Sequence, residues 1–214
     1  MSEYGASSVS AARLRLALYV AAGLALGAFA AVVLLPNVSE RLFPPLKINS
    51  VGRALVGGPF TLTDHSGQRV SDTDFRGKFL LVIFGYTFCP DVCPSELQLI
   101  SAALDALGPK AERIVPLFIT VDPERDTPEQ LATYLKSFHP RLIGLTGTPS
   151  EIAAVAKEYR VYVRKAPDPK STAGYSMDHS ALIYLMGPDG AYLAHFTPGI
   201  GVETLTQRLS GLIG

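Results

Sequence analysis

The segment from Phe79 to Cys93 constrains the fold of this chain more than any other part of the sequence. Phe79–Phe84 is a continuous apolar run, which is typical of a central strand buried on both faces. The chain's two cysteines, Cys89 and Cys93, follow this run and precede a helical pattern. A strand that leads through a short loop into a helix brings these thiols to the positive end of the helix dipole, where the thiolate is favoured. The pattern therefore indicates a nucleophile or a metal site.

A functional pair of cysteines is favoured over two inert ones. Free cysteine packs as a small hydrophobic residue, so two core thiols without a chemical role are the alternative. Here both cysteines lie together at a strand-to-helix junction, and each is followed by a proline. If Cys93 lies in the first turn of the helix, it and Cys89 face the same point in space.

Strand and helix patterns alternate through the rest of the chain. Strands are predicted at residues 60–63, 69–70, 79–84, 114–121, 180–186 and 192–196. Helices are predicted after Cys93, after the capping sequences Thr127-Pro128-Glu129-Gln130 and Thr148-Pro149-Ser150-Glu151, and over Leu205, Leu209 and Leu212. This order predicts an α/β fold in which a mixed sheet is flanked by helices.

The N-terminal part of the chain predicts a membrane anchor. Leu16 to Leu35 is an uncharged apolar stretch with roughly the 20 residues that a helix needs to cross a bilayer. Arg13 and Arg15 precede it, which places the N-terminus in the cytoplasm. A cleaved signal peptide ending at Ala28-Phe29-Ala30 is the alternative, but the apolar stretch is longer than a signal core of about 7–15 residues.

Four segments follow from this reading, and together they indicate a bacterial inner-membrane protein with a single span. The part beyond the anchor, about 175 residues, is the size of one domain and is expected in the periplasm. The 19 basic and 19 acidic residues give a net charge of +0 without a basic run, so no nucleic-acid partner is expected. The segments are a cytoplasmic tail (1–15), a transmembrane anchor (16–36), a linker (37–57) and a folded domain (58–214).

Three motifs together resemble the Sco/SenC family of membrane-anchored copper proteins. They are Cys89-x-x-x-Cys93-Pro94 after Phe84-Gly85-Tyr86-Thr87, the segment from Val121 to Pro128, and Asp178-His179-Ser180. The resemblance runs from about Gly58 to the C-terminus. It implies a thioredoxin-like fold for the domain.

The resemblance also implies a function and a ligand set. Sco-like proteins bind one copper ion, as Cu(I), Cu(II) or both, and the matching ligands here are Cys89, Cys93 and His179. They deliver copper to the binuclear centre of cytochrome c oxidase subunit II, or prepare its cysteines. Partners therefore include that subunit and a periplasmic copper donor or thiol reductant. Independently of the family, two thiolates favour soft Cu(I), and an added imidazole suits Cu(II).

His179 is a better ligand candidate than the other three histidines. His65 lies in a predicted turn, His139 at a helix end and His195 in an outer strand, so each has a structural interpretation. His179 is expected at the start of the strand 180–186, beside the cysteine loop. Redox enzymes of this fold carry a cis-proline there, whereas this chain reads Met177-Asp178-His179-Ser180. Met177 is either packing or a soft contact for copper.

A periplasmic thiol-disulfide oxidoreductase that uses Cys89 and Cys93 without metal is the main alternative, so enzymatic activity stays open. A peroxidase is disfavoured because Tyr86 stands where peroxide chemistry needs Thr or Ser. A purely structural membrane-tethered protein leaves the cysteines unexplained. Tyr86 and Phe88 are expected to shield the metal from water, or to belong to the core.

The charged loop with Asp122, Arg125 and Asp126 follows a predicted central strand, at the edge where α/β sheets place their sites. Two interpretations remain open for it. Arg125 pairs with Asp122 and Asp126 pre-caps the next helix, or the loop docks a partner or tunes copper.

Overall fold

The computed structural model describes residues 15–24, 26–27, 55–169, 171 and 173–214. The chain divides into two units, Met1–Val51 and Gly52–Gly214. In the first unit, residues 15–24 and 26–27 are helical. Among the described residues, no helix is both long and apolar enough to cross a membrane. Most of the predicted tail and linker, and part of the predicted anchor, lie outside the described residues.

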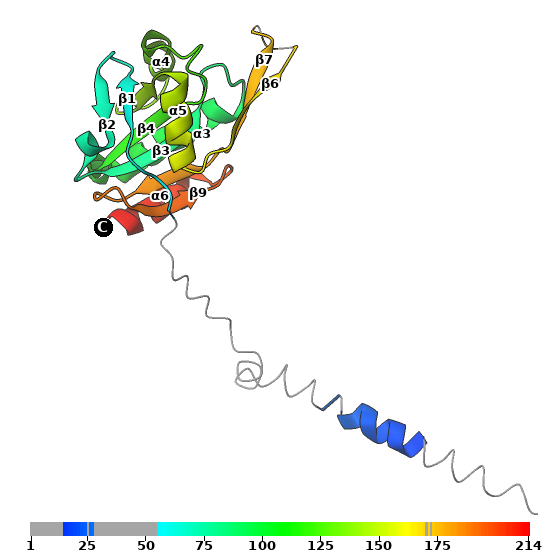
Figure 1. Ribbon diagram of the computed structural model, residues 1–214. Coiled ribbons are helices and arrows are strands. Elements are labelled where there is room, and N and C mark those ends of the chain that lie inside the picture. Colours follow the sequence, from blue (N-terminus) through cyan, green and yellow to red (C-terminus); the bar gives the residue numbers. More distant parts are fainter. Residues whose placement is uncertain (1–14, 25, 28–54, 170, 172) are drawn as a thin grey trace, which may run out of the picture. The chain divides into compact units, whose positions relative to one another are not determined.

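The second unit is built on a mixed sheet, as predicted, and this sheet has seven strands (Figure 1). The central strands β3 (Phe79–Gly85), β4 (Ile114–Thr120) and β5 (Ile143–Thr146) run parallel, and the outer strands pair antiparallel. All seven residues of β3 are buried, which confirms the central strand. In spatial order the strands are β2 (Arg69–Ser71), β1 (Thr61–Asp64), β5 (Ile143–Thr146), β4 (Ile114–Thr120), β3 (Phe79–Gly85), β8 (Ile183–Met186) and β9 (Tyr192–Phe196).

Helices cover both faces of this sheet because the side chains of β3 alternate between two apolar clusters. Leu81 and Ile83 point into one cluster, with apolar residues of α3, α4 and α6. Leu80 and Val82 point into the other, with those of α5. The α-helices are α3 (Val92–Leu107), α4 (Pro128–Leu135), α5 (Pro149–Glu158) and α6 (Val202–Ile213), and two 3₁₀ turns are η1 (Asp72–Phe75) and η2 (Gly108–Arg113).

The two predicted capping boxes have different outcomes. At α5, Thr148 and Glu151 cap each other's backbone N–H groups, so this box is confirmed. At α4, Thr127 accepts from the Gln130 N–H, but the return bond is not made. The Thr127 N–H donates to the Arg125 carbonyl at 3.1 Å, and the Gln130 side-chain amide donates to Thr87 Oγ1 at 3.2 Å. That side chain is directed to the cysteine loop instead of the cap.

The predicted strand 180–186 is wrong in its first half. β8 begins only at Ile183, and His179 ends a different strand, β7 (Tyr175–His179). β7 pairs with β6 (Val163–Pro167) in a separate two-stranded sheet, which projects from the domain in Figure 1. This β6–β7 hairpin and the strand β5 were not predicted.

Candidate metal centre

The two cysteines meet at the junction between β3 and α3. Cys93 lies in the first turn of α3 and is 1% exposed, while Cys89 is half-buried in the loop before the helix. The Cys93 N–H points at Cys89 Sγ over 3.5 Å. Both thiols are free. The strand–loop–helix pattern therefore brings the two sulfurs together as predicted.

The environment gives the two thiols opposite acidities. The pKa of Cys89 falls to about 5, mainly because the Cys93 thiol donates a hydrogen bond to it, with help from the backbone N–H groups of Cys93 and Asp91. The pKa of Cys93 rises, because its proton is held in that hydrogen bond and because it is buried. The pair therefore holds one thiolate, at Cys89, and one thiol, at Cys93. A thiolate is the form that binds metal or attacks a disulfide.

His179 faces this pair from the end of β7. Its Nε2 lies 3.7 Å from Cys93 Sγ, and its Nδ1 lies 3.1 Å from the carbonyl oxygen of Ser180. A carbonyl only accepts hydrogen bonds, so the ring proton is placed on Nδ1 and the Nε2 lone pair is left free toward the sulfur. Tyr86 stands edge-on to the imidazole, with ring centroids 6.1 Å apart.

The three predicted ligands are thus gathered in one place. Two sulfur atoms and one imidazole nitrogen form a donor set that suits copper. Within the described part of the chain, no group of three His, Cys, Asp or Glu side chains already has the spacing of a metal-binding cluster.

Asp126 fastens the cysteine loop to the sheet. Its fully buried carboxylate accepts from Thr87 N at 3.0 Å, Thr87 Oγ1 at 2.7 Å and Thr120 Oγ1 at 2.6 Å. Burial raises the pKa of Asp126, against the lowering effect of these hydrogen bonds. The N-cap of α4 is Thr127. The expectation that Asp126 pre-caps this helix is therefore wrong, because its oxygens are used by Thr87 and Thr120.

Arg125 pairs with Asp122, which confirms the structural part of the expectation for this loop. The Arg125 Nε donates to Asp122 Oδ2, and the Tyr175 hydroxyl donates to Asp122 Oδ1 at 3.1 Å. Tyr175 was not identified from the sequence. Tyr175, Met177 and His179 alternate with polar Ser176 and Asp178, and this period of two was the available signal for a strand.

The remaining candidates lie around the centre or away from it. Tyr86 is buried and Phe88 is 44% exposed, so Tyr86 shields the site more fully. Met177 is partly buried and packs in the apolar cluster on the α5 side of the sheet. The other three histidines form hydrogen bonds elsewhere: His65 accepts from the Gly144 N–H, His139 accepts from the Arg141 N–H, and His195 Nδ1 pairs with the Tyr192 hydroxyl.

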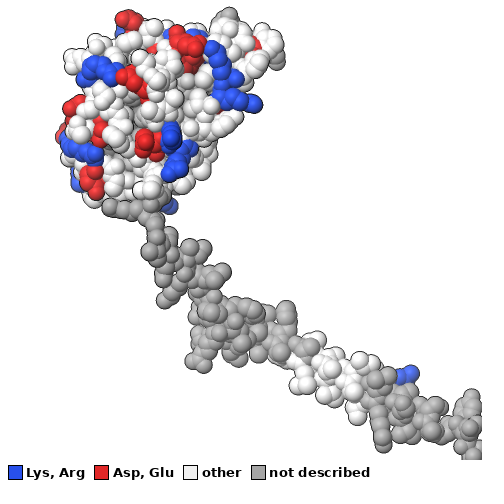
Figure 2. Space-filling model, in the orientation of Figure 1, with Lys and Arg blue, Asp and Glu red and all other residues white. Residues whose placement is uncertain are grey.

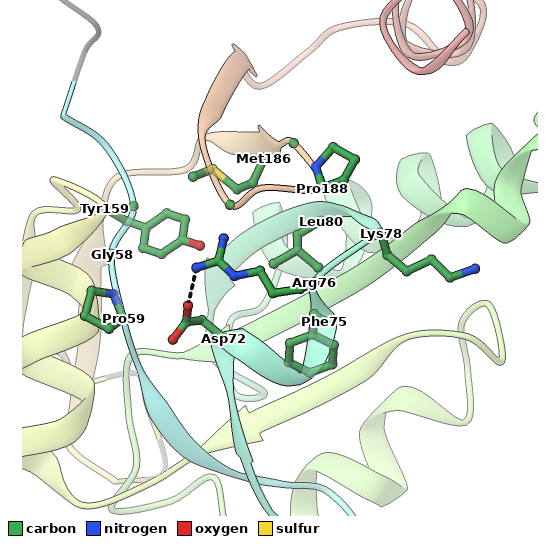
Figure 3. Close-up of a pocket in the computed structure, with 13 residues that line it drawn as sticks. Gly58, Pro59, Asp72, Phe75, Arg76, Lys78, Leu80, Tyr159, Met186 and Pro188 are labelled. Atoms are coloured by element: carbon green, nitrogen blue, oxygen red, sulfur yellow. Dashed lines mark hydrogen bonds and ion pairs between the residues drawn. The ribbon is translucent and has the colours of Figure 1, made fainter.

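A cavity of about 160 Å³ lies at the opposite end of β3, bordered by Leu80, Tyr159 and Met186 (Figure 3). Its two cations are already engaged. Arg76 binds Asp72 at 2.8 Å, and the Lys78 ammonium donates to the carbonyl of Glu112 at 3.0 Å. On the face of the domain shown in Figure 2, basic and acidic side chains are interspersed. The cysteine–histidine centre is therefore the stronger functional candidate.

Comparison with known proteins places this centre in a family context. The SCO1/SenC family model matches residues 49–214. The chain is 48% identical over 149 residues to the mitochondrial SCO1 homologue of Homo sapiens, a match that covers 68% of this chain and 49% of that protein. It is 45% identical over 168 residues to sco1 of Schizosaccharomyces pombe, covering 77% of this chain and 62% of that protein. The chain thus spans less than two thirds of these curated relatives.

Solved structures of Sco proteins also match this chain. The copper-bound ScoI of Bradyrhizobium japonicum matches with a TM-score of 0.68 and 48% identity, over 73% of this chain and 99% of that chain. The copper-bound ScoI of Arabidopsis thaliana matches with a TM-score of 0.70 and 43% identity, over 74% of this chain and 98% of that chain. These matches confirm the thioredoxin-like α/β fold expected from the resemblance. With the family model covering most of its length, the chain belongs to the SCO1/SenC family.

Proposed function

We propose that this protein is a copper metallochaperone that carries one copper ion on Cys89, Cys93 and His179. The observation that carries the proposal is the 3.7 Å approach of His179 Nε2 to Cys93 Sγ, beside the Cys89 thiol. Two relatives with solved structures, from Bradyrhizobium japonicum and Arabidopsis thaliana, are copper-bound. The client is the binuclear copper centre of cytochrome c oxidase subunit II, as the family resemblance implies.

The chain's own groups divide the work of holding copper. Cys89 offers a thiolate at neutral pH because its pKa is about 5. Cys93 must release the proton that its raised pKa retains, so copper binding releases a proton. His179 supplies a neutral nitrogen donor. Two sulfurs suffice for Cu(I), whereas Cu(II) favours the added nitrogen, so His179 governs retention of Cu(II).

Membrane attachment belongs to the same proposal. An anchor at residues 16–36 with the domain in the periplasm keeps the carrier beside a membrane-embedded client. Its support is the uncharged apolar sequence from Leu16 to Leu35 with Arg13 and Arg15 before it.

A thiol-disulfide reductase is the second candidate, and the low pKa of Cys89 favours it. A thiolate beside a second thiol is the arrangement that attacks a client disulfide and then resolves the mixed disulfide. The His179→Ala variant separates the two functions, because disulfide exchange needs the two sulfurs and not the imidazole. If that variant fails to assemble the oxidase at limiting copper while its disulfide potential is unchanged, metal delivery is the function. Full oxidase activity despite weak copper binding would favour the reductase.

A further inference from the structure

The β6–β7 hairpin lies outside the sheet that positions the cysteines. β3 and α3 carry the cysteine loop, whereas His179 ends β7, which pairs with β6 in a separate two-stranded sheet. β7 leads through residues 180–182 into β8, but β7 itself pairs with β6 and not with a described strand of the main sheet. Contacts outside the main sheet therefore help to hold the hairpin against the domain.

Arg125 lies where the hairpin meets the cysteine loop. Its guanidinium carbon is 4.0 Å from the ring centroid of Tyr175, on β7, and 4.7 Å from that of Phe88, next to Cys89. Tyr86 is the third ring, at 5.6 Å, and it stands edge-on to His179. One cation therefore contacts both the segment that carries the sulfurs and the segment that carries the imidazole.

The ion pair between Arg125 and Asp122 is largely buried, unlike an ordinary surface ion pair. The Arg125 side chain is 11% exposed and that of Asp122 is 3% exposed. Asp122 also accepts from the Tyr175 hydroxyl, so the carboxylate joins Arg125 to the hairpin a second time. Arg125 Nη2 is buried without a hydrogen-bond acceptor. The faces of the surrounding aromatic rings interact with the guanidinium instead. A buried cation is costly unless it is paired, and Tyr175 adds a ring face and a hydroxyl to this pair from the hairpin.

Lysine does not reproduce this contact. The planar guanidinium stacks on aromatic faces while it donates from its edge, whereas an ammonium is a compact point charge. Lys165 makes a different contact, since its Nζ lies over the Tyr175 ring at 3.9 Å and pairs with exposed Glu124.

We propose that Arg125 is a positioning residue that clasps the β6–β7 hairpin to the cysteine loop and thereby holds His179 at the metal centre. The clasp consists of Arg125, Asp122, Tyr175 and Phe88. Its effect on copper rests on the proposed function, while its effect on the hairpin does not.

Hydrogen exchange on the metal-free, reduced full-length chain tests the clasp itself. In Arg125→Met, backbone amides of β6 and β7 should exchange about tenfold faster, while those of β3 and β4 keep their wild-type protection. Arg125→Lys should restore little of the difference. Arg164→Met is the matched control, because the Arg164–Asp178 pair lies within the hairpin. Unchanged β6–β7 exchange in Arg125→Met, or equal acceleration in β3 and β4, would overturn the proposal.

A double-mutant cycle on Cu(II) affinity tests whether Arg125 acts through His179. In the wild-type background, Arg125→Met should weaken Cu(II) binding by about 10- to 100-fold, the usual effect of removing an outer-shell partner. In the His179→Ala background the same substitution should have no effect, because the ligand that it positions is gone. Equal weakening in both backgrounds would contradict positioning of His179.

Tyr175→Leu covers the case in which Arg125→Met does not fold. It removes the ring and the hydroxyl on the hairpin side but leaves the Arg125–Asp122 pair and the Phe88 contact in place, and it should give the same exchange pattern. If the wild-type chain binds no copper, the proposed function fails, while the exchange experiment still decides on the clasp.

Discussion

The imidazole Nε2 of His179 lies 3.7 Å from Cys93 Sγ, although 86 positions separate the two residues, with Cys93 in helix α3 and His179 in the small β6–β7 sheet. Cys93 is placed by the start of α3, and His179 by the end of β7. The centre thus depends on the contact between the cysteine loop and the β6–β7 hairpin. Substitutions on the loop and on the hairpin can therefore test the roles of the sulfurs and of the imidazole separately.

His179→Ala should weaken Cu(II) binding strongly but measurably, while Cu(I) binding and the Cys89–Cys93 disulfide survive. Cu(II) favours nitrogen donors and tends to oxidise a site of two bare thiolates, whereas a disulfide needs only the two sulfurs. A copper competition assay and a redox titration of the cysteine pair measure the two effects. His195→Ala is the control, since His195 is exposed on β9. Wild-type Cu(II) affinity in His179→Ala would refute the ligand assignment.

Cys89 should alkylate well before Cys93 at pH 6. The pKa of Cys89 is lowered to about 5, so its thiolate forms as the pH rises through 5 and is lost below it. The pKa of Cys93 is raised, so that thiol stays protonated. Iodoacetamide labelling from pH 4 to 9, read by mass spectrometry, should show Cys89 reaching its plateau near pH 6. A Cys89 rate that still rises above pH 8 would show an unperturbed thiol.

Asp126→Ala should destabilise the domain by about 2–4 kcal/mol, because three donors around this buried carboxylate lose their acceptor. The affected groups are the N–H and hydroxyl of Thr87 and the hydroxyl of Thr120. Urea unfolding measures the loss. Asp126→Asn keeps one acceptor oxygen and should recover part of it, and substitution of exposed Glu112 by Ala serves as the control. A loss within that control's range would show that Asp126 does not fasten the loop.

A periplasm-active reporter fused after residue 45 should be active, and one fused at residue 5 should be silent. The reason is the arginine pair before the uncharged stretch, which retains the N-terminus in the cytoplasm. Membrane fractionation of the untagged protein complements the fusions. A soluble periplasmic form with a new N-terminus near Ala31 would instead prove cleavage.

Most of the main sheet could be predicted because its signals are local. The apolar run of β3 and the Thr148 capping box each specify their element within a few residues. β5 is only four residues long and contains Gly144, whose missing side chain leaves room for Leu131 and Leu135 of α4. This packing depends on tertiary contacts that the sequence does not reveal. The short, glycine-containing segment of β5 therefore showed no clear strand pattern.

The centre was predictable from residue type, but the contacts that hold it were not. Two cysteines and one histidine in family-like motifs indicate the proposed donors. The clasp between Arg125 and Tyr175 joins residues 50 positions apart, and the bond from Thr87 to Asp126 spans 39. No periodic pattern in the sequence signals either of these long-range contacts. Sequence alone therefore left the roles of Arg125 and Asp126 open.

Copper analysis of the reduced, purified chain, combined with X-ray absorption at the copper edge, tests the central claim most directly. The proposed centre predicts one copper ion per chain, with sulfur and nitrogen neighbours, and loss of binding once Cys89 and Cys93 form a disulfide. A first shell of only nitrogen and oxygen, or full copper binding by the oxidised protein, would contradict it.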